Sequence, residues 1–147
     1  MSFDARAALE ELAARAAIHD VILRYARGVD RRDFELVAAC FTPDATVDYG
    51  DFFRGEVGGL IPAIATGLAA FATTMHLIGN HLVELDGDRA TSETYAVAHH
   101  RGDSAAKPFD LVIGVRYLDA LGRAQGHWRI ARRTVEYVWR REDAVTP

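Results

Sequence analysis

The chain has 147 residues, a formal net charge of −4 at pH 7, and hydrophobic side chains at half of its positions. These values suit one globular domain over residues 1–147, and the absence of a basic stripe gives no electrostatic reason to expect nucleic acid. The single cysteine, Cys40, excludes an internal disulfide, and no apolar run reaches the length of a transmembrane helix. We therefore expect a cytoplasmic protein that binds neither nucleic acid nor membrane.

The first predicted element is a long helix over residues 4 to 28, where apolar side chains recur at helical spacing on one face. Gly28 is the expected stop, because glycine adopts positive φ at little cost. Asp30 then falls just beyond the helix, where the negative end of the helix dipole would raise its pKa. A carboxylate in that place needs a proton-donating partner, and His76 is the candidate.

Shorter elements are predicted to follow. Their ranges, in chain order, are a helix from Asp33 or Phe34 to about Cys40, a turn over residues 42–45, a strand over 46–49, and a helix from Glu56 or Leu60 to Phe71 that Pro62 and Gly67 loosen.

From residue 75 onward the pattern predicts strands over residues 75–85, 89–101, 108–120 and 126–140. The Asp86-Gly87-Asp88 segment predicts a hairpin turn, because glycine there supplies positive φ. Helices followed by an antiparallel meander are typical of an α+β fold. A curved sheet wrapped on helices would leave a small-molecule pocket between the two layers.

The alternation of side chains along a strand predicts which face of the sheet each strand histidine occupies. His99 and His100 are adjacent, so they must point to opposite faces and only one can line a cavity. His100 shares its face with small residues such as Ala98, which leave room for a ligand, and we favour it over His99. His81 is off-parity from His76 and should face away from it. The other histidines are expected at the surface: His19 and His127.

Several fragments resemble the SnoaL-like branch of the nuclear-transport-factor-2-like superfamily, in the same order. They are residues 15–20 with Tyr25 and 28–30, then 41–45, 76–80 and 126–130. The resemblance covers about residues 8 to 140. It implies a cone-shaped α+β barrel, with N-terminal helices packed on a strongly curved, mostly antiparallel sheet that encloses a cavity.

Within that superfamily the chain looks most similar to scytalone dehydratase, hexachlorocyclohexane dehydrochlorinase and the bile-acid dehydratase. The first two pair an aspartate after the first helix with a histidine on the first long strand, the places of Asp30 and His76 here. His100 fits the second histidine of scytalone dehydratase. Val29 stands where that enzyme has a tyrosine, which argues against scytalone itself as the substrate.

Two tyrosines carry further resemblance. Tyr49 resembles the carbonyl-activating tyrosine of scytalone dehydratase, and Tyr25 resembles a site tyrosine of the bile-acid enzyme. The remaining predicted substrate contacts are Val29, Asn80 and Ala98. Whether Arg132 or Arg133 reaches the site stays open.

An Asp–His pair suits proton abstraction, because the carboxylate fixes the imidazole tautomer and stabilises the imidazolium that forms. His76 would take a proton next to a carbonyl or leaving group, Tyr25 or Tyr49 would donate to the oxyanion, and His100 would assist departure of hydroxide. The sequence thus predicts a cofactor-independent, dehydratase-like lyase for a small apolar cyclic substrate.

Other functions stay open. The same cavity could isomerise or cyclise a polyketide or steroid-like ketone, or the domain could be a non-catalytic binding or assembly module. Asp30, His76 and one of His99 or His100 could form a two-histidine, one-carboxylate metal set, but no close-ligand motif supports it and the family pattern is metal-free. A sheet that is apolar on both faces needs outer cover, so we expect a homo-oligomer, a trimer rather than a dimer.

Overall fold

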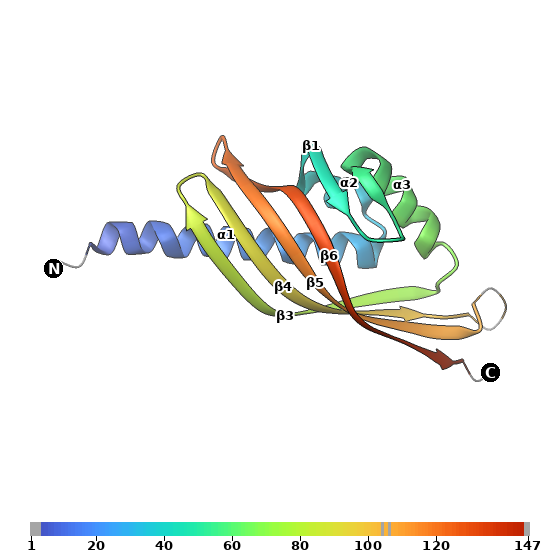
Figure 1. Cartoon of the computed structure of the whole chain (residues 1–147). Helices are drawn as coiled ribbons and strands as arrows, with labels where there is room; N and C mark the ends of the chain where they lie inside the picture. Colours follow the sequence, from blue (N-terminus) through green and yellow to red (C-terminus); the bar gives the residue numbers. More distant parts are fainter. Residues whose placement is uncertain (1–3, 104, 106, 146–147) are drawn as a thin grey trace.

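The computed structural model describes residues 4–103, 105 and 107–145, which form three helices and six strands (Figure 1). The helices are α1 (Ala5–Arg31), α2 (Phe34–Ala39) and α3 (Val57–Leu68). The strands are β1 (Phe41–Asp48), β2 (Arg54–Glu56), β3 (Thr73–Asp86), β4 (Arg89–Arg101), β5 (Phe109–Ala124) and β6 (His127–Ala144).

The strands form one curved sheet in the order β2-β1-β6-β5-β4-β3, with α1 lying across one face (Figure 1). Every neighbouring pair is antiparallel except β1 and β6, which run parallel. The expected α+β architecture, with helices packed on a strongly curved and mostly antiparallel sheet, is confirmed.

Helix α1 begins where the sequence predicts and ends later. The Asp4 carboxylate accepts the backbone N–H groups of the first turn, as an N-cap does. The predicted stop at Gly28 is wrong, because the helix runs to Arg31 and the left-handed residue is Arg32, at φ 59°. Gly28 has another role: a Cβ atom there would lie 2.7 Å from Val37 Cγ2, so its lack of a side chain lets α2 pack closely on α1.

The predicted turn over residues 42–45 is also wrong, since β1 already starts at Phe41. The pairing between β1 and β6 shifts register between Phe41 and Thr46, and Pro43 lies inside this irregular stretch. Proline is tolerated there because it interrupts no regular run of ladder hydrogen bonds.

A β-bulge in β3 decides which histidines face the helices. Ile78 pairs with Ala96, but the next pairing is His81 with Thr94, so β3 has one more residue than β4 in this interval. The extra residue reverses the alternation of side chains. His81 therefore lies on the same face as His76, and the prediction that it faces away is wrong.

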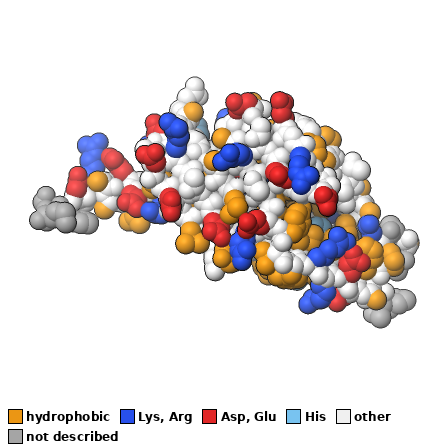
Figure 2. Space-filling view, in the orientation of Figure 1, with side chains coloured by type: hydrophobic (Ala, Val, Ile, Leu, Met, Phe, Trp, Pro, Cys, Tyr) orange, Lys and Arg blue, Asp and Glu red, His pale blue; other side chains and the backbone are white. Residues whose placement is uncertain are grey.

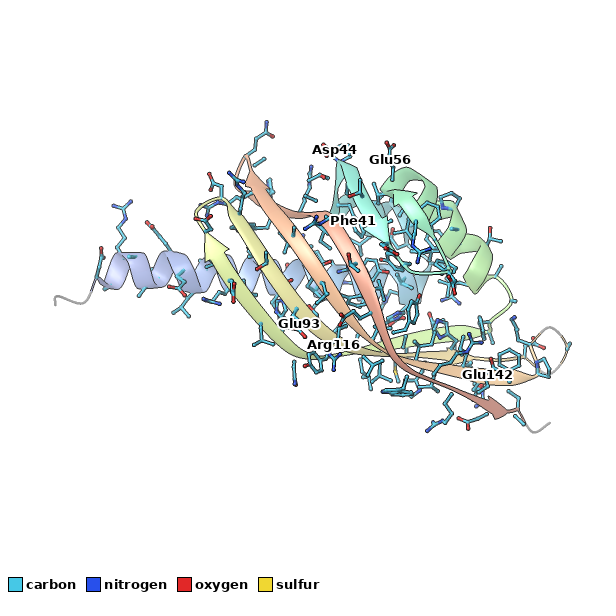
Figure 3. All side chains as sticks on the ribbon, in the orientation of Figure 1. Phe41, Asp44, Glu56, Glu93, Arg116 and Glu142 are labelled. Atoms are coloured by element: carbon cyan, nitrogen blue, oxygen red, sulfur yellow. The ribbon has the colours of Figure 1, made fainter. Side chains whose placement is uncertain are left out.

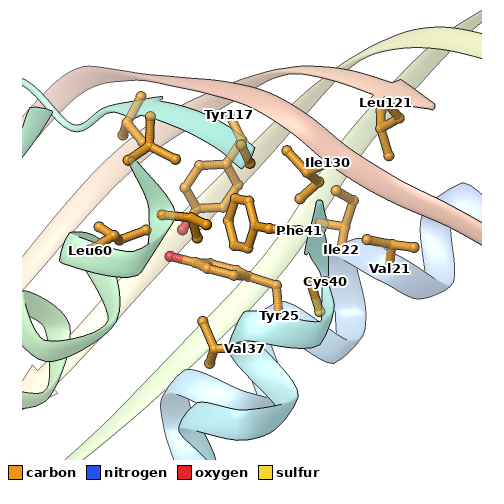
Figure 4. Close-up of a cluster of buried hydrophobic side chains, with 14 of the residues drawn as sticks. Val21, Ile22, Tyr25, Val37, Cys40, Phe41, Leu60, Tyr117, Leu121 and Ile130 are labelled. Carbon is orange, nitrogen blue, oxygen red and sulfur yellow. The ribbon is translucent and has the colours of Figure 1, made fainter. Parts of the chain in front are cut away.

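The core fills the space between α1 and the concave face of the sheet (Figure 4). Ile18 and Ile22 of α1 are fully buried and meet Ile130 of β6 and Leu121 of β5 in one apolar cluster. Burying side chains of this size contributes about 1.5–3 kcal/mol each, so this contact fixes α1 on the sheet.

The convex face of the sheet is left with large apolar side chains in water (Figure 2). Met75 and Leu77 are each 54% exposed, and Trp139 is 44% exposed. Arg116 lies beside Glu93 on this face (Figure 3), with its guanidinium 5.0 Å from the Tyr95 ring. Among the described residues, no helix combines the length and the apolar composition that crossing a bilayer requires.

Candidate active site

Asp30 and His76 are in direct contact at the edge of the cavity between α1 and the sheet. Asp30 Oδ1 lies 2.7 Å from His76 Nδ1, and Asp30 Oδ2 accepts the backbone N–H of His76 at 2.9 Å. The two bonds hold the carboxylate against both the ring and the backbone of one residue. Because a carboxylate only accepts, Nδ1 is the protonated nitrogen and Nε2 is left for a ligand.

The pKa of Asp30 is lowered, which contradicts the rise expected from a position beyond the helix end. Burial alone would raise this pKa, but the hydrogen bonds from the His76 ring and backbone and the interaction with the His76 charge lower it further than burial raises it. Asp30 lies inside the last turn of α1, and these hydrogen bonds outweigh the dipole of the helix end. Asp30 is therefore ionised at neutral pH.

His76 opens onto a cavity of about 250 Å³. Apolar side chains from α1, α3 and strands β4 to β6 make most of its wall, and none of the described residues that line it is Lys, Arg, Asp or Glu. The lining residues are Tyr25, Val29, Tyr49, Phe52, Ile64, Gly67, Leu68, Phe71, His76, Ala98, His100, Leu111, Ile113, Val115, Tyr117, Val135 and Tyr137. A neutral, largely apolar ligand suits this wall.

His100, rather than His99, lies on the cavity wall, with its ring centroid 6.2 Å from that of His76. Its Nδ1 lies 3.1 Å from the carbonyl oxygen of Leu111, so Nδ1 donates and Nε2 carries a lone pair. Burial lowers the pKa of His100, and the nearby His76 lowers it further, against a rise from the Leu111 carbonyl. The neutral ring is then a hydrogen-bond acceptor.

A second polar group on the cavity wall is a pair of tyrosines. The hydroxyl oxygens of Tyr25, on α1, and Tyr49, after β1, lie 2.9 Å apart. Tyr137 donates to the backbone carbonyl of Tyr49 at 3.2 Å and so holds it from the far side. Burial raises the pKa of both Tyr25 and Tyr49, so both hydroxyls stay protonated. One donates to the other, and the second hydrogen is free for a ligand oxygen.

A buried ion pair packs against Tyr25 and Tyr117 from behind the cavity wall. Arg133 donates to both carboxylate oxygens of Asp119 at 2.7 Å, and both side chains have no exposed surface. The guanidinium lies 4.3 Å from the Tyr25 ring and 4.2 Å from the Tyr117 ring. Of the two arginines left open by the sequence, the one that packs against the site is therefore Arg133, and it does not line the cavity. Figure 4 shows the hydroxyl ends of Tyr25 and Tyr117 on the side of Leu60.

Comparison with known proteins identifies the family that has this architecture. The SnoaL-like domain pattern matches residues 10–134. The chain belongs to the SnoaL-like family. Uncharacterized protein Rv2910c of Mycobacterium tuberculosis is 32% identical over 129 residues, which cover 84% of each chain.

Many solved structures share the fold of this protein, and two serve as examples. A putative scytalone dehydratase from Novosphingobium aromaticivorans has a TM-score of 0.79 at 22% identity, covering 92% of this chain and 91% of that one. The type 3 hexachlorocyclohexane dehydrochlorinase from Novosphingobium barchaimii has a TM-score of 0.77 at 20% identity, covering 95% and 98%. At these identities the likeness establishes the fold.

Most of the site residues predicted from sequence meet at this cavity of the SnoaL-like domain. Tyr25, Val29, Tyr49, Ala98 and the two histidines line it, and Asp30 stands behind His76. Asn80 does not: it lies within the bulge, in a groove of the convex face beside Tyr95 and Trp139. The prediction that Asn80 contacts the ligand is wrong for this cavity.

Sequence reasoning missed part of the wall. Ile113, Val115 and Tyr117 line the cavity at alternate positions of β5, and this alternation was available as a signal. Phe52 and Phe71 come from connecting segments, and the sequence of these segments has no periodic pattern that would indicate a position on the cavity wall. In the ranges that the structure describes, no three His, Cys, Asp or Glu side chains converge as metal ligands do.

Proposed function

We propose that this protein is a cofactor-independent lyase that eliminates water from a small, neutral, cyclic β-hydroxy ketone. The observation that carries the proposal is the contact between Asp30 and His76 at the cavity wall. The fixed tautomer leaves His76 Nε2 as a base, and the carboxylate stabilises the imidazolium that proton capture creates. The fold shared with a dehydrochlorinase and a putative dehydratase supports an elimination.

The reaction begins with proton transfer. His76 Nε2 takes the proton from the carbon next to the carbonyl, the electron pair of that C–H bond forms a C=C bond to the carbonyl carbon, and the π pair of the C=O bond moves to the oxygen. The Tyr25–Tyr49 pair donates a hydrogen bond to the enolate oxygen that forms. Because both hydroxyls are already buried and protonated, they can donate to this charge without a further cost of removing them from water.

Loss of water completes the reaction. The enolate electrons return to form the C=C bond as the β C–O bond breaks, and the imidazolium of His76 gives its proton to the departing hydroxide. The products are an unsaturated ketone and water, and His76 is neutral again. His100 accepts the hydrogen bond of the substrate hydroxyl through Nε2 and orients it toward His76. This role is positioning, since a neutral His100 with its proton on Nδ1 cannot supply the acid.

The test is turnover of a panel of cyclic β-hydroxy ketones by wild type, His76→Ala and Tyr49→Phe, with His99→Ala as control. His99 neighbours the site in sequence and lies on the other face of β4, so His99→Ala should retain activity. Loss of water only in wild type and the control supports the lyase. A shifted double bond without loss of water would indicate the isomerase, and saturable binding without turnover would indicate a binding module; either result overturns the proposal.

We also propose that the protein is a homo-oligomer, with a trimer as the expected form. The apolar convex face supports this, since Met75, Leu77 and Trp139 expose large side chains together. Exposed apolar patches on a folded protein mark interaction sites more often than chance would give.

A further inference from the structure

Helix α1 is joined to β3 by a second polar contact far from the cavity. His19 Nδ1 lies 2.9 Å from His81 Nδ1, and the two rings are tilted with centroids 4.9 Å apart. One turn earlier on α1, Arg15 donates to the carbonyl oxygen of Val83 at 2.5 Å. These contacts involve residues that the proposed reaction does not use.

The two histidine contacts are separated by similar lengths along the helix and along the strand. His19 and Asp30 are eleven residues apart on α1, which spans about 16 Å at a rise of about 1.5 Å per residue. Their partners His81 and His76 are five residues apart on β3, but the bulge gives this interval the length of the four residues from Thr94 to Ala98 on β4, about 13 Å at roughly 3.3 Å per residue. The helix and the strand therefore run in opposite directions, and forming one contact brings the residues of the other close together.

The β-bulge makes this arrangement possible. Without the extra residue between Ile78 and His81, regular alternation would turn the His81 ring to the convex face. With it, the ring lies between α1 and the sheet, where its Nε2 atom is buried and has no hydrogen-bond partner among the described residues. The Nδ1 contact with His19 is then the hydrogen bond that holds this ring.

Protonation limits that contact. Two Nδ1 atoms at 2.9 Å can share a single proton, one ring donating and the other accepting. When both rings are imidazolium, both nitrogens carry hydrogen and the contact is repulsive.

The other charged groups that face the pair are already paired. Arg15 on α1 forms an ion pair with Glu11, and Asp119 on β5 is held by Arg133 of β6. On the exposed side of α1, next to His19, Asp20 is paired with Arg24. A second positive charge on the histidine pair therefore meets no uncommitted carboxylate among these neighbours.

We propose that the His19–His81 contact holds α1 on β3 in a pH-dependent way. Protonation of both rings breaks this contact and disturbs the register of the Asp30–His76 pair. This proposal goes beyond the proposed function, because it concerns how α1 packs on β3 and not the reaction.

The sign of the pH dependence follows from His81. Burial lowers the pKa of His81, and the charge of His19 lowers it further, against a smaller rise from Asp119. The unfolded chain, with a histidine pKa of about 6.5, then binds more protons than the folded one below that pH. Unfolding therefore becomes easier as pH falls below about 6.5, by up to about tenfold in the equilibrium constant per pH unit for each such histidine.

The first test is urea unfolding between pH 7.5 and 5, which needs no substrate. Wild type is compared with His81→Gln and His19→Gln, and with His127→Gln as a control on an exposed histidine at the start of β6. His81→Gln should reduce the pH dependence of the unfolding equilibrium constant by up to about tenfold per pH unit. The His127→Gln control should show the same pH dependence as wild type. His100 is present in all four proteins, so its contribution to the pH dependence should cancel in the comparison. A plain structural role would lower stability equally at every pH.

The second measurement reports the coupling to the site. The Nδ1–H proton of His76 gives a nuclear magnetic resonance signal that requires the bond to Asp30. In wild type this signal should weaken between pH 7.5 and 5.5, and in His19→Gln it should persist, because glutamine can bond to His81 without adding charge. Equal pH slopes in wild type and both variants, or a wild-type His76 signal that persists at pH 5.5, would overturn the proposal. Neither outcome depends on whether the protein is a lyase.

Discussion

Replacing Asp30 by asparagine should nearly abolish proton abstraction while leaving the cavity in place. The charge centres of the carboxylate and of a His76 imidazolium are about 4 Å apart, where an effective dielectric constant of about 20 gives an attraction of about 4 kcal/mol. Losing that attraction in the transition state corresponds to a rate about a thousandfold lower. Asparagine has the same shape as aspartate, so the chain should still fold with the cavity in place, without the stability that the lowered pKa of Asp30 contributes.

The substitution also changes the tautomer of the base. Asp30 accepts two N–H groups of His76, one from the backbone and one from the ring. An amide offers one oxygen, so its NH2 group must face one of those positions. If it faces the ring, the proton of His76 moves to Nε2 and the base is lost.

Two measurements check this prediction. Nitrogen chemical shifts of His76 report the tautomer without substrate, and turnover of the best β-hydroxy ketone reports the rate. Asp20→Asn is the matched control, because Asp20 lies on the same helix in an exposed pair with Arg24. Turnover of Asp30→Asn within threefold of wild type, with an unchanged His76 tautomer, would refute the reasoning.

Further expectations concern stability, pH and assembly. Arg133→Leu leaves the Asp119 charge buried and unpaired, so chemical denaturation should show a loss of about 3–5 kcal/mol, and a smaller loss when Asp119 is replaced by Leu as well. Gly28→Ala should cost about 1–3 kcal/mol, because its new methyl group would collide with Val37, whereas Gly58→Ala on α3 meets open space and should not destabilise. The lowered pKa of Asp30 stabilises the fold above the unfolded pKa of about 3.9, and this contribution is lost as pH falls through the folded value, so Asp30→Asn should flatten the pH dependence below about pH 4 in urea melts. Trp139→Glu on the convex face should shift the mass measured by light scattering from oligomer toward monomer, and an unchanged mass would exclude that face as the interface.

The fold was largely predictable because its signals are periodic. The alternation after residue 75 indicates the long strands, and the helical spacing before residue 28 indicates α1. The order of helices and strands then leaves few architectures. The position of Asp30 at the helix end indicates that it needs a proton-donating partner, and the resemblance supports His76 as that partner; local pattern alone does not pair residues so far apart in sequence.

The errors share a physical origin, since each depends on contacts made by another segment. Gly28 resembles a helix stop in sequence, yet its use is to admit Val37 of α2. The bulge in β3 is set by pairing with β4, and it reverses the faces assigned to Asn80 and His81. The turn predicted around Pro43 disappears because β6 pairs with β1 on both sides of it. The local sequence pattern does not indicate which distant segments a residue will contact.

The uncharged wall of the cavity has a consequence for how ligands would be held. None of the described side chains that line it is a lysine, arginine, aspartate or glutamate. A compound that binds there exchanges hydration for apolar surface and a few neutral hydrogen bonds, and displaces no counterions. Its dissociation constant should therefore hardly respond to sodium chloride between 50 mM and 500 mM, while adding one carboxylate to the same compound should prevent binding.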